Sequence, residues 1–399
     1  MKLRCRKMLG QVFGVVFLFQ AFPSLAAVTA TDTAGPDGKP LVVVENSAMK
    51  LTVDPSQGGR VSSFIWKATG KEWVLAGECG FFLDHVWQQT WPGELIHRPY
   101  SARILDRGPE RATVEVAVTI EGKGDKNIEG VRLVRTMTVT GDRPGIEVTI
   151  RLENPTAEPR APGLWVQNAP QVGGVRDDLW TFRPSTRGII RASANYSSGA
   201  CVITPGEYKA ADDFRSDPVA GWTAQTYPPS GEGVVFLMDY NYLRCLYDNA
   251  GSQTVEWWYD QVRLAPGKSF ETRFTMWPIS GMRAVGYAGR TLVGDLQMNV
   301  KEPDLTLVSR MVAGPDPVLG PARVKLELLD YDTGEVLRSK EFPGVDVSAT
   351  PVEQDFPIPG APFVKNLLAR STVTTADGRS QVYENFRAHG AVIGTETLY

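Results

Sequence analysis

Short segments in which apolar and polar residues alternate with a period of two dominate this sequence. The clearest are Thr113–Ile120, Val131–Val139 and Gly145–Leu152. Successive side chains of a β-strand point to opposite faces, so this alternation indicates strands with one buried and one solvated face, as in antiparallel sheets. No stretch of a dozen residues combines a 3.6-residue period with both helix caps. The chain is therefore predicted to be all-β.

Further strands are expected on both sides of these segments, separated by turns. The 399 residues include 39 glycines and 28 prolines, which favours many turns and few long helices. The additional expected strands are Leu41–Val44, Lys50–Val53, Arg60–Trp66, Gly233–Met238, Phe270–Met276, Leu305–Val312, Arg323–Leu329, Glu335–Lys340, Val364–Thr374 and Ser380–Phe386.

The distribution of tryptophan indicates a domain boundary. All ten tryptophans lie between Trp66 and Trp277, and the strand pattern loosens between Ser280 and Pro303 before it resumes. We therefore expect a large domain over residues 41–285, a linker over 286–303 and a second domain over 304–399. The strand count of the second domain suits a small β-sandwich of immunoglobulin or fibronectin type.

The N-terminus has the composition of a secretory signal. Residues 1–7 carry four basic and no acidic side chains, residues 8–22 are almost wholly apolar, and small residues follow at Ser24 and Ala26. The apolar run is shorter than the ~20 residues that span a bilayer, which favours a cleaved signal at 1–26 over a membrane anchor. Residues 27–40 are expected to form a flexible leader. The mature protein is expected to be secreted or periplasmic, with no stable membrane span.

Charge argues against nucleic acid as a partner. The chain has 42 Lys and Arg against 45 Asp and Glu, a formal net charge of −3. Cleavage of the signal takes away four positive charges and no negative one, so the mature chain carries −7. No basic surplus remains to bind a phosphate backbone.

No motif for a cofactor or a metal ion stands out. The sequence lacks GxGxxG after a strand, HExxH, GxSxG and CxxC, and it holds only three histidines. We therefore expect no cofactor and no metal. Cys79, Cys201 and Cys245 remain after signal cleavage; buried thiols are favoured over a Cys201–Cys245 bridge. An acidic stretch at Asp212, Asp213 and Asp217 could host Ca²⁺, but a solvated loop is favoured.

Three segments mix aromatic rings with hydrogen-bonding side chains in the way that sugar sites do. They are Phe81–Glu94, Trp165–Asn168 and Glu256–Asp260. A sugar has an apolar C–H face that stacks on indole and hydroxyls that bind amides and carboxylates. The alternative is that these rings belong to the core. The candidate substrate-binding residues are Trp87, Trp91, His97, Trp165, Gln167, Asn168, Trp257 and Trp258, with His85 and Glu256 as further hydrogen-bonding groups.

Three stretches of the large domain carry motifs in a distinctive order. Val44–Leu75 contains a Gly-Gly-Arg turn and a Thr-Gly-Lys hairpin, Leu133–Thr156 reads as a strand pair followed by a strand ending in Asn, and Val255–Ile279 places a carboxylate before a Leu-Ala-Pro-Gly turn. In this order the stretches resemble galactose-mutarotase-like proteins. The resemblance implies a β-supersandwich, two large stacked antiparallel sheets with a sugar site on a concave face. The expected architecture is thus a supersandwich followed by an immunoglobulin-like β-sandwich.

The same resemblance implies an acid–base pair. Glu256 aligns with the glutamate of the family's mutarotases, and His85 or His97 falls near one of their histidines. The histidine expected after the Asn154 strand is missing, because that stretch reads Gly-Leu-Trp-Val-Gln-Asn. Three interpretations stay open: a secreted binding protein for oligo- or polysaccharide, an epimerase or polysaccharide lyase that uses Glu256 and His85, and a structural or adhesive envelope protein.

Overall fold

The computed structural model describes residues 27–186, 188–193, 196–197, 212–215, 218–249, 252–316, 318 and 320–389. Within these residues almost all regular structure is strand, and helix is confined to one 3₁₀ turn, Val172–Gly174. No helix in this part of the chain is long and apolar enough to cross a membrane.

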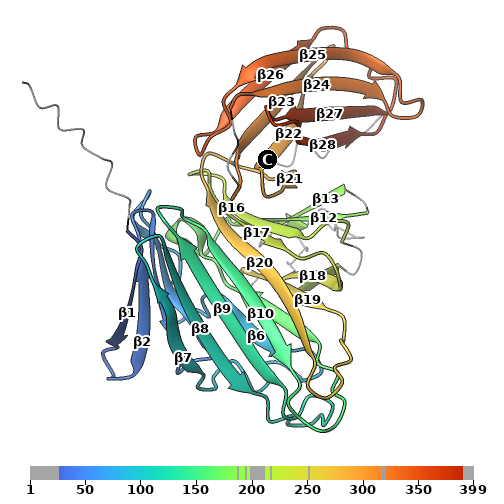
Figure 1. Cartoon of the computed structure of the whole chain (residues 1–399). Coiled ribbons are helices and arrows are strands. Elements are labelled where there is room, and N and C mark those ends of the chain that lie inside the picture. Colours follow the sequence, from blue (N-terminus) through green and yellow to red (C-terminus); the bar gives the residue numbers. More distant parts are fainter. Residues whose placement is uncertain are drawn as a thin grey trace, which may run out of the picture.

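Three antiparallel sheets form the large domain (Figure 1). The first has the order β1 (Thr29–Ala34), β2 (Pro40–Glu45), β3 (Met49–Asp54), β4 (Arg60–Trp66), β5 (Lys71–Glu72). The second is ten-stranded, in the order β14 (Tyr196–Ser197), β13 (Gly188–Ser193), β12 (Trp180–Ser185), β16 (Trp222–Tyr227), β17 (Glu232–Met238), β20 (Ser269–Ile279), β10 (Ile146–Glu153), β9 (Arg132–Thr140), β8 (Arg111–Thr119), β7 (Ser101–Arg107). The third has the order β15 (Asp212–Arg215), β18 (Leu243–Asn249), β19 (Thr254–Tyr259), β11 (Leu164–Asn168), β6 (Leu83–Val86).

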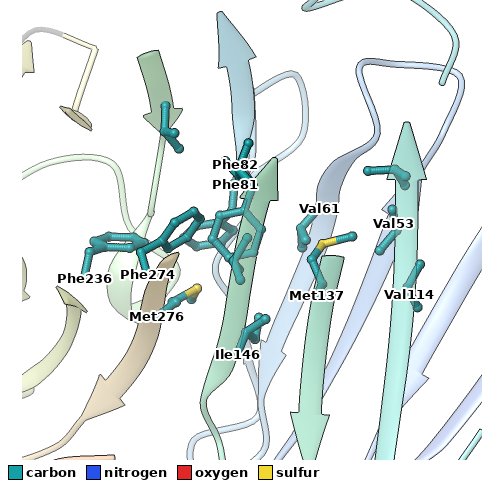
Figure 2. Close-up of a cluster of buried hydrophobic side chains, with 14 of the residues drawn as sticks. Val53, Val61, Phe81, Phe82, Val114, Met137, Ile146, Phe236, Phe274 and Met276 are labelled. Atoms are coloured by element: carbon teal, nitrogen blue, oxygen red, sulfur yellow. The ribbon is translucent and has the colours of Figure 1, made fainter. Parts of the chain in front are cut away.

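One continuous hydrophobic core joins these three sheets. It contains Val53 and Val61 of the first sheet, Val114 and Met137 of the ten-stranded sheet, and Trp257 of the third. Figure 2 shows part of it, with side chains from the different strands meeting between the layers. Alternate residues of β10 are buried, which is the period of two that its sequence predicts.

The C-terminal domain is a sandwich of two four-stranded antiparallel sheets with a core of its own. One sheet has the order β21 (Tyr287–Ala288), β22 (Leu292–Lys301), β23 (Asp304–Ala313), β26 (Val352–Ile358). The other has the order β25 (Val336–Val345), β24 (Ala322–Asp330), β27 (Leu367–Thr374), β28 (Ser380–Arg387). The predicted fold class is confirmed: the protein is all-β, with layered sheets followed by a β-sandwich.

The two domains meet through apolar side chains. Val234 and Phe236 of β17 lie in the large core, whereas Val235 and Leu237 point the other way, into a cluster shared with Val293 of β22. Both faces of β17 are therefore buried, which agrees with its unbroken apolar run. The C-terminal domain covers the outer face of the ten-stranded sheet at this end (Figure 1).

Two predicted segment boundaries are wrong. Residues 27–40 are not a flexible leader, because Thr29–Ala34 pair with β2 and bury Val28 and Ala30. The predicted linker 286–303 contains β22, whose Leu292, Leu296 and Met298 lie in the core of the C-terminal sandwich. The alternation of apolar and polar residues is weak in both segments, so each forms a strand only because a neighbouring strand supplies its hydrogen bonds.

Candidate functional site

Strand register brings most of the predicted site residues onto one face of the third sheet. His85 of β6 stands opposite Trp165 of β11, which stands opposite Trp258 of β19. Two residues further along β11, Gln167 stands opposite Glu256 of β19, and Glu256 in turn stands opposite Tyr247 of β18. Residues directly opposite each other point to the same face. We call these six residues the array: His85, Trp165, Gln167, Tyr247, Glu256 and Trp258.

Hydrogen bonds and ring contacts connect the array internally. His85 Nε2 lies 3.0 Å from Gln167 Oε1, and Trp165 Nε1 donates to Glu256 Oε2 at 2.6 Å. The Trp165 ring also lies against the His85 imidazole, with centroids 4.7 Å apart and an interplanar angle of 31°. Trp258 meets Trp165 edge to face at 5.3 Å. Trp165 is thus held in one orientation by both candidate acid–base residues.

Burial moves the pKa values of the two titratable groups in opposite directions. His85 is 3% exposed and Glu256 is 2% exposed. Desolvation raises the pKa of Glu256 to about 7, although hydrogen bonds from Thr254, Trp165 and Gln167 favour the carboxylate. Desolvation lowers the pKa of His85 to about 4, against hydrogen bonds with Gln167 and the Pro92 carbonyl. The raised pKa lets the Glu256 carboxyl take up a proton near neutral pH, whereas the lowered pKa of His85 keeps its imidazole neutral.

The raised pKa of Glu256 predicts a distinct pH dependence of stability. The folded protein binds this proton more tightly than the unfolded chain between the ordinary pKa of 4.5 and about 7. This carboxyl therefore destabilises the fold progressively as the pH rises through that window. We expect the free energy of unfolding of Glu256→Gln, relative to the unchanged protein, to increase by about 3 kcal/mol from pH 4 to pH 8. Urea denaturation of both proteins across this range measures it.

His85 sets the control for that measurement. Its lowered pKa makes the unfolded chain bind the proton more tightly between about pH 4 and the ordinary 6.5, so its contribution to stability rises with pH in that window. In the unchanged protein the two residues change the free energy of unfolding with pH in opposite directions. A variant that lacks one of the two titrating side chains should therefore show the pH dependence that comes from the other. If the difference in free energy of unfolding between Glu256→Gln and the unchanged protein does not change with pH, Glu256 has an ordinary pKa in the folded protein.

Two predicted ligand-binding residues face the core. Trp257 is fully buried, with its ring against Phe274 and Phe236 at centroid distances of 5.0 and 5.5 Å. Asn168 accepts a hydrogen bond from the Phe82 amide and donates to the Val255 carbonyl. Both side chains lie one position out of step with the array, so the alternation of a strand turns them inward. Their predicted place on a sugar-facing surface is wrong.

The remaining predicted residues follow β6 in the chain and lie outside the array. Trp87 is half-buried, donates from Nε1 to the Tyr259 carbonyl at 2.9 Å and lies under the Arg244 guanidinium. Trp91 is 56% exposed, next to Pro92, whose carbonyl contacts His85. His97 is exposed and pairs with Gln57 Oε1 at 3.3 Å. Trp91 is thus an exposed residue close to His85 of the array. Trp87 instead bonds to the backbone of β19 in the third sheet, and His97 bonds to Gln57 outside the array.

Tyr247 and Cys79 adjoin the site although the sequence reasoning did not place them there. The Tyr247 ring is nearly parallel to that of Trp258, at 6.3 Å. Cys79 is partly exposed, and burial raises the pKa of its thiol, with a further contribution from the charge of Glu256. The register between β18 and β19 places Tyr247, and no local pattern encodes that register. Cys201 lies outside the described residues, so the possible Cys201–Cys245 bridge is not described.

A buried ion pair fixes β6 from the opposite side. Asp84, the neighbour of His85, faces inward and pairs with Arg135 of β9, and both side chains are 0% exposed. Arg135 also donates to the carbonyls of Phe82 and Gly59. Gly59 and Gly58 have φ angles of 62° and 70°, which glycine adopts readily, so the Gly-Gly-Arg turn presents its carbonyl to Arg135. The ten-stranded sheet thereby holds the strand that carries His85.

Among the described residues, no group of three His, Cys, Asp or Glu side chains is placed to hold a metal ion. Asp212 and Asp213 belong to β15, and Asp217 lies outside the described residues.

Comparison with known proteins gives similarities of chain arrangement only. No family model and no curated protein matches this sequence. A TPR-domain containing protein from Parabacteroides distasonis is 14% identical over 67% of this chain, with a TM-score of 0.47, and this chain spans 56% of it. Galactose mutarotase-like proteins from Clostridium acetobutylicum and Lactobacillus casei are 11% and 14% identical over 64% and 60% of this chain and 99% of their own, with TM-scores of 0.43 and 0.41. At these scores the similarities carry no argument about activity.

Proposed function

We propose that this protein is an exported carbohydrate-binding protein that holds its sugar against the array. One observation carries the proposal: Trp165 and Trp258 are half-buried, meet edge to face, and lie beside the buried polar groups of His85, Gln167 and Glu256. Indole faces stack on the C–H face of a sugar, and amide and carboxyl groups bind its hydroxyls. Export rests on the sequence of residues 1–26 alone.

The array is organised before any ligand arrives. Trp165 is fixed by its hydrogen bond to Glu256 and by the His85 ring, so little side-chain freedom is lost when a sugar binds. Glu256 and Gln167 are 2% and 5% exposed. A sugar therefore meets the half-buried indoles first, because the Glu256 carboxyl is almost completely covered.

Carbohydrate epimerisation or elimination is the second candidate function. The observation that favours it is the pair of opposed protonation states, with the pKa of Glu256 at about 7 and that of His85 at about 4. General acid–base catalysis favours a group whose pKa lies near the working pH, and Glu256 meets this condition at neutral pH. In this role Glu256 and His85 would exchange protons with sugar oxygens. A purely structural or adhesive role is the third interpretation, and it requires no ligand at the array.

Binding is tested by calorimetric titration of the purified protein with a panel of neutral monosaccharides and oligosaccharides. We expect saturable binding of one sugar class, and Trp258→Ala should weaken it about 5- to 150-fold, the equivalent of 1–3 kcal/mol. Tyr331→Ala is the matched control, because Tyr331 is an exposed aromatic residue of the C-terminal domain. If no sugar of the panel binds, the result would favour the structural or adhesive role. Equal affinity in Trp258→Ala would remove the array from the binding site.

Catalysis is tested separately on any sugar that binds. Proton NMR of that sugar follows anomer exchange and the appearance of unsaturated product. Glu256→Gln should abolish turnover while leaving the fold intact. Unchanged rates in this variant would leave Glu256 without a catalytic role.

A further inference from the structure

A cavity lies where the large domain meets the C-terminal sandwich, and no residue of the array lines it. Its volume is about 550 Å³, within the range of small-ligand sites. Segments far apart in the chain line it: the turn after β2, the end of β4, the turn between β9 and β10, the end of β20 and parts of the C-terminal domain. We call it the junction pocket, defined by Trp66, Lys67, Arg143, Pro144, Trp277 and Pro278.

Hydrogen bonds hold the walls of the junction pocket in place. The buried Asn46 amide donates from Nδ2 to the carbonyls of Gly141 and Arg143, at 2.8 and 2.9 Å. Its Oδ1 accepts from the amides of Ala48 and Met49, at 2.9 and 2.8 Å. Asn46 thereby ties the β2–β3 turn to the β9–β10 turn. The pocket is formed before a ligand binds, which reduces the entropy lost on binding.

The C-terminal domain orients the aromatic wall. Trp277 Nε1 donates to the Ala313 carbonyl at 3.3 Å, across the domain boundary. On the large-domain side, a Cβ at Gly145 would lie 2.4 Å from the Trp277 ring, so glycine allows the indole to lie flat against the β10 end of the turn. Trp66 and the two prolines complete an apolar wall.

Arg143 supplies the available charge. Its guanidinium lies over the Trp277 ring, 5.5 Å from the centroid. Within the described part of the chain it forms no ion pair, whereas Lys67 is neutralised by Glu45 at 2.7 Å and bonded to the Asn46 carbonyl. Asp142 also lines the pocket and is exposed. One free guanidinium with a carboxylate nearby favours a ligand with a single negative charge over a phosphate dianion.

We propose that the junction pocket binds a ring that bears one carboxylate, namely a uronic acid residue. The planar guanidinium of Arg143 matches a carboxylate in a two-pronged hydrogen bond. The apolar wall of Trp66, Pro144 and Pro278 contacts the C–H face of the sugar ring. This inference concerns a site separate from the array and stands without the function proposed there.

Calorimetric titration of the purified protein with glucuronate and galacturonate tests the proposal. We expect at least one uronate to bind, and glucose and galactose to bind at least about tenfold more weakly at this site. Arg143→Gln should weaken uronate binding at least about tenfold, and Arg143→Lys less, because lysine keeps the charge without the planar fork. Arg111→Gln is the matched control, since it removes one exposed arginine of β8 that pairs with Asp106.

Two further variants complete the test. Ala68→Trp fills the rim of the pocket from an exposed position and should block binding without touching Arg143. Tyr331→Ala, at an exposed aromatic residue that does not line the pocket, should leave uronate affinity unchanged. The proposal is overturned by no uronate binding, by equal affinity in Arg143→Gln, or by inorganic phosphate or benzoate binding where uronates do not.

Discussion

Replacing Arg135 by methionine should lower the free energy of unfolding by about 3–5 kcal/mol, because the Asp84 carboxylate would stay buried without its cation. Both side chains are 0% exposed, so water cannot replace the lost partner. The carbonyls of Phe82 and Gly59 would lose their donor as well. Urea denaturation followed by circular dichroism measures the change.

The matched control removes both charges together. A variant with Arg135→Met and Asp84→Leu leaves no buried ion, and replacing a buried pair by apolar side chains is often close to neutral. We therefore expect the double variant to recover most of the stability that the single variant loses. If the single variant is as stable as the unchanged protein, the ion pair is not what holds β6 against the ten-stranded sheet.

Replacing Trp257 by alanine should destabilise the protein by about 3–5 kcal/mol, because it leaves a large cavity in the core. The Trp257 ring is fully buried and packs on Phe274 and Phe236, which join the third sheet to the ten-stranded sheet. Thermal and urea unfolding measure the loss. Sugar binding should survive under conditions where the variant is folded, since Trp257 faces away from the array.

Its neighbour Trp258 is the internal control, being the same residue type on the same strand. Trp258 is half-buried on the array face, so Trp258→Ala should lose less stability than Trp257→Ala and more sugar affinity. The reverse order of stability losses would mean that the two faces of β19 are assigned the wrong way round.

The alternation of apolar and polar residues and the apolar runs were sufficient to predict thirteen of the 28 strands in the described residues. Segments such as 145–152 and 270–276 become β10 and part of β20, because burial of one face of a strand demands a period of two. The strands that were not predicted include β1 and β22, because TATDTA and the stretch around Leu292 become regular only when a neighbouring strand supplies the hydrogen bonds.

The candidate site was predicted in part. Glu256, Trp258, Gln167 and Trp165 are spaced two apart on their strands, so the sequence could group them by strand. It could not say which of Trp257 and Trp258 faces inward, because both alternatives satisfy the same alternation. Tyr247 depends on register between strands, and the raised pKa of Glu256 depends on burial that no local pattern encodes.

The all-β class of this chain, and the segments that concentrate indoles and hydrogen-bonding groups, follow from the amino-acid sequence alone. These properties are local, since side-chain periodicity and composition act over a few residues. The buried face of each strand is known only from the folded chain. The same holds for the network that links His85 to Glu256 through Trp165 and Gln167, and for the junction pocket in which Arg143 lies beside Trp277. Those properties depend on pairing between segments far apart in the chain, whose register is selected by packing of the whole core.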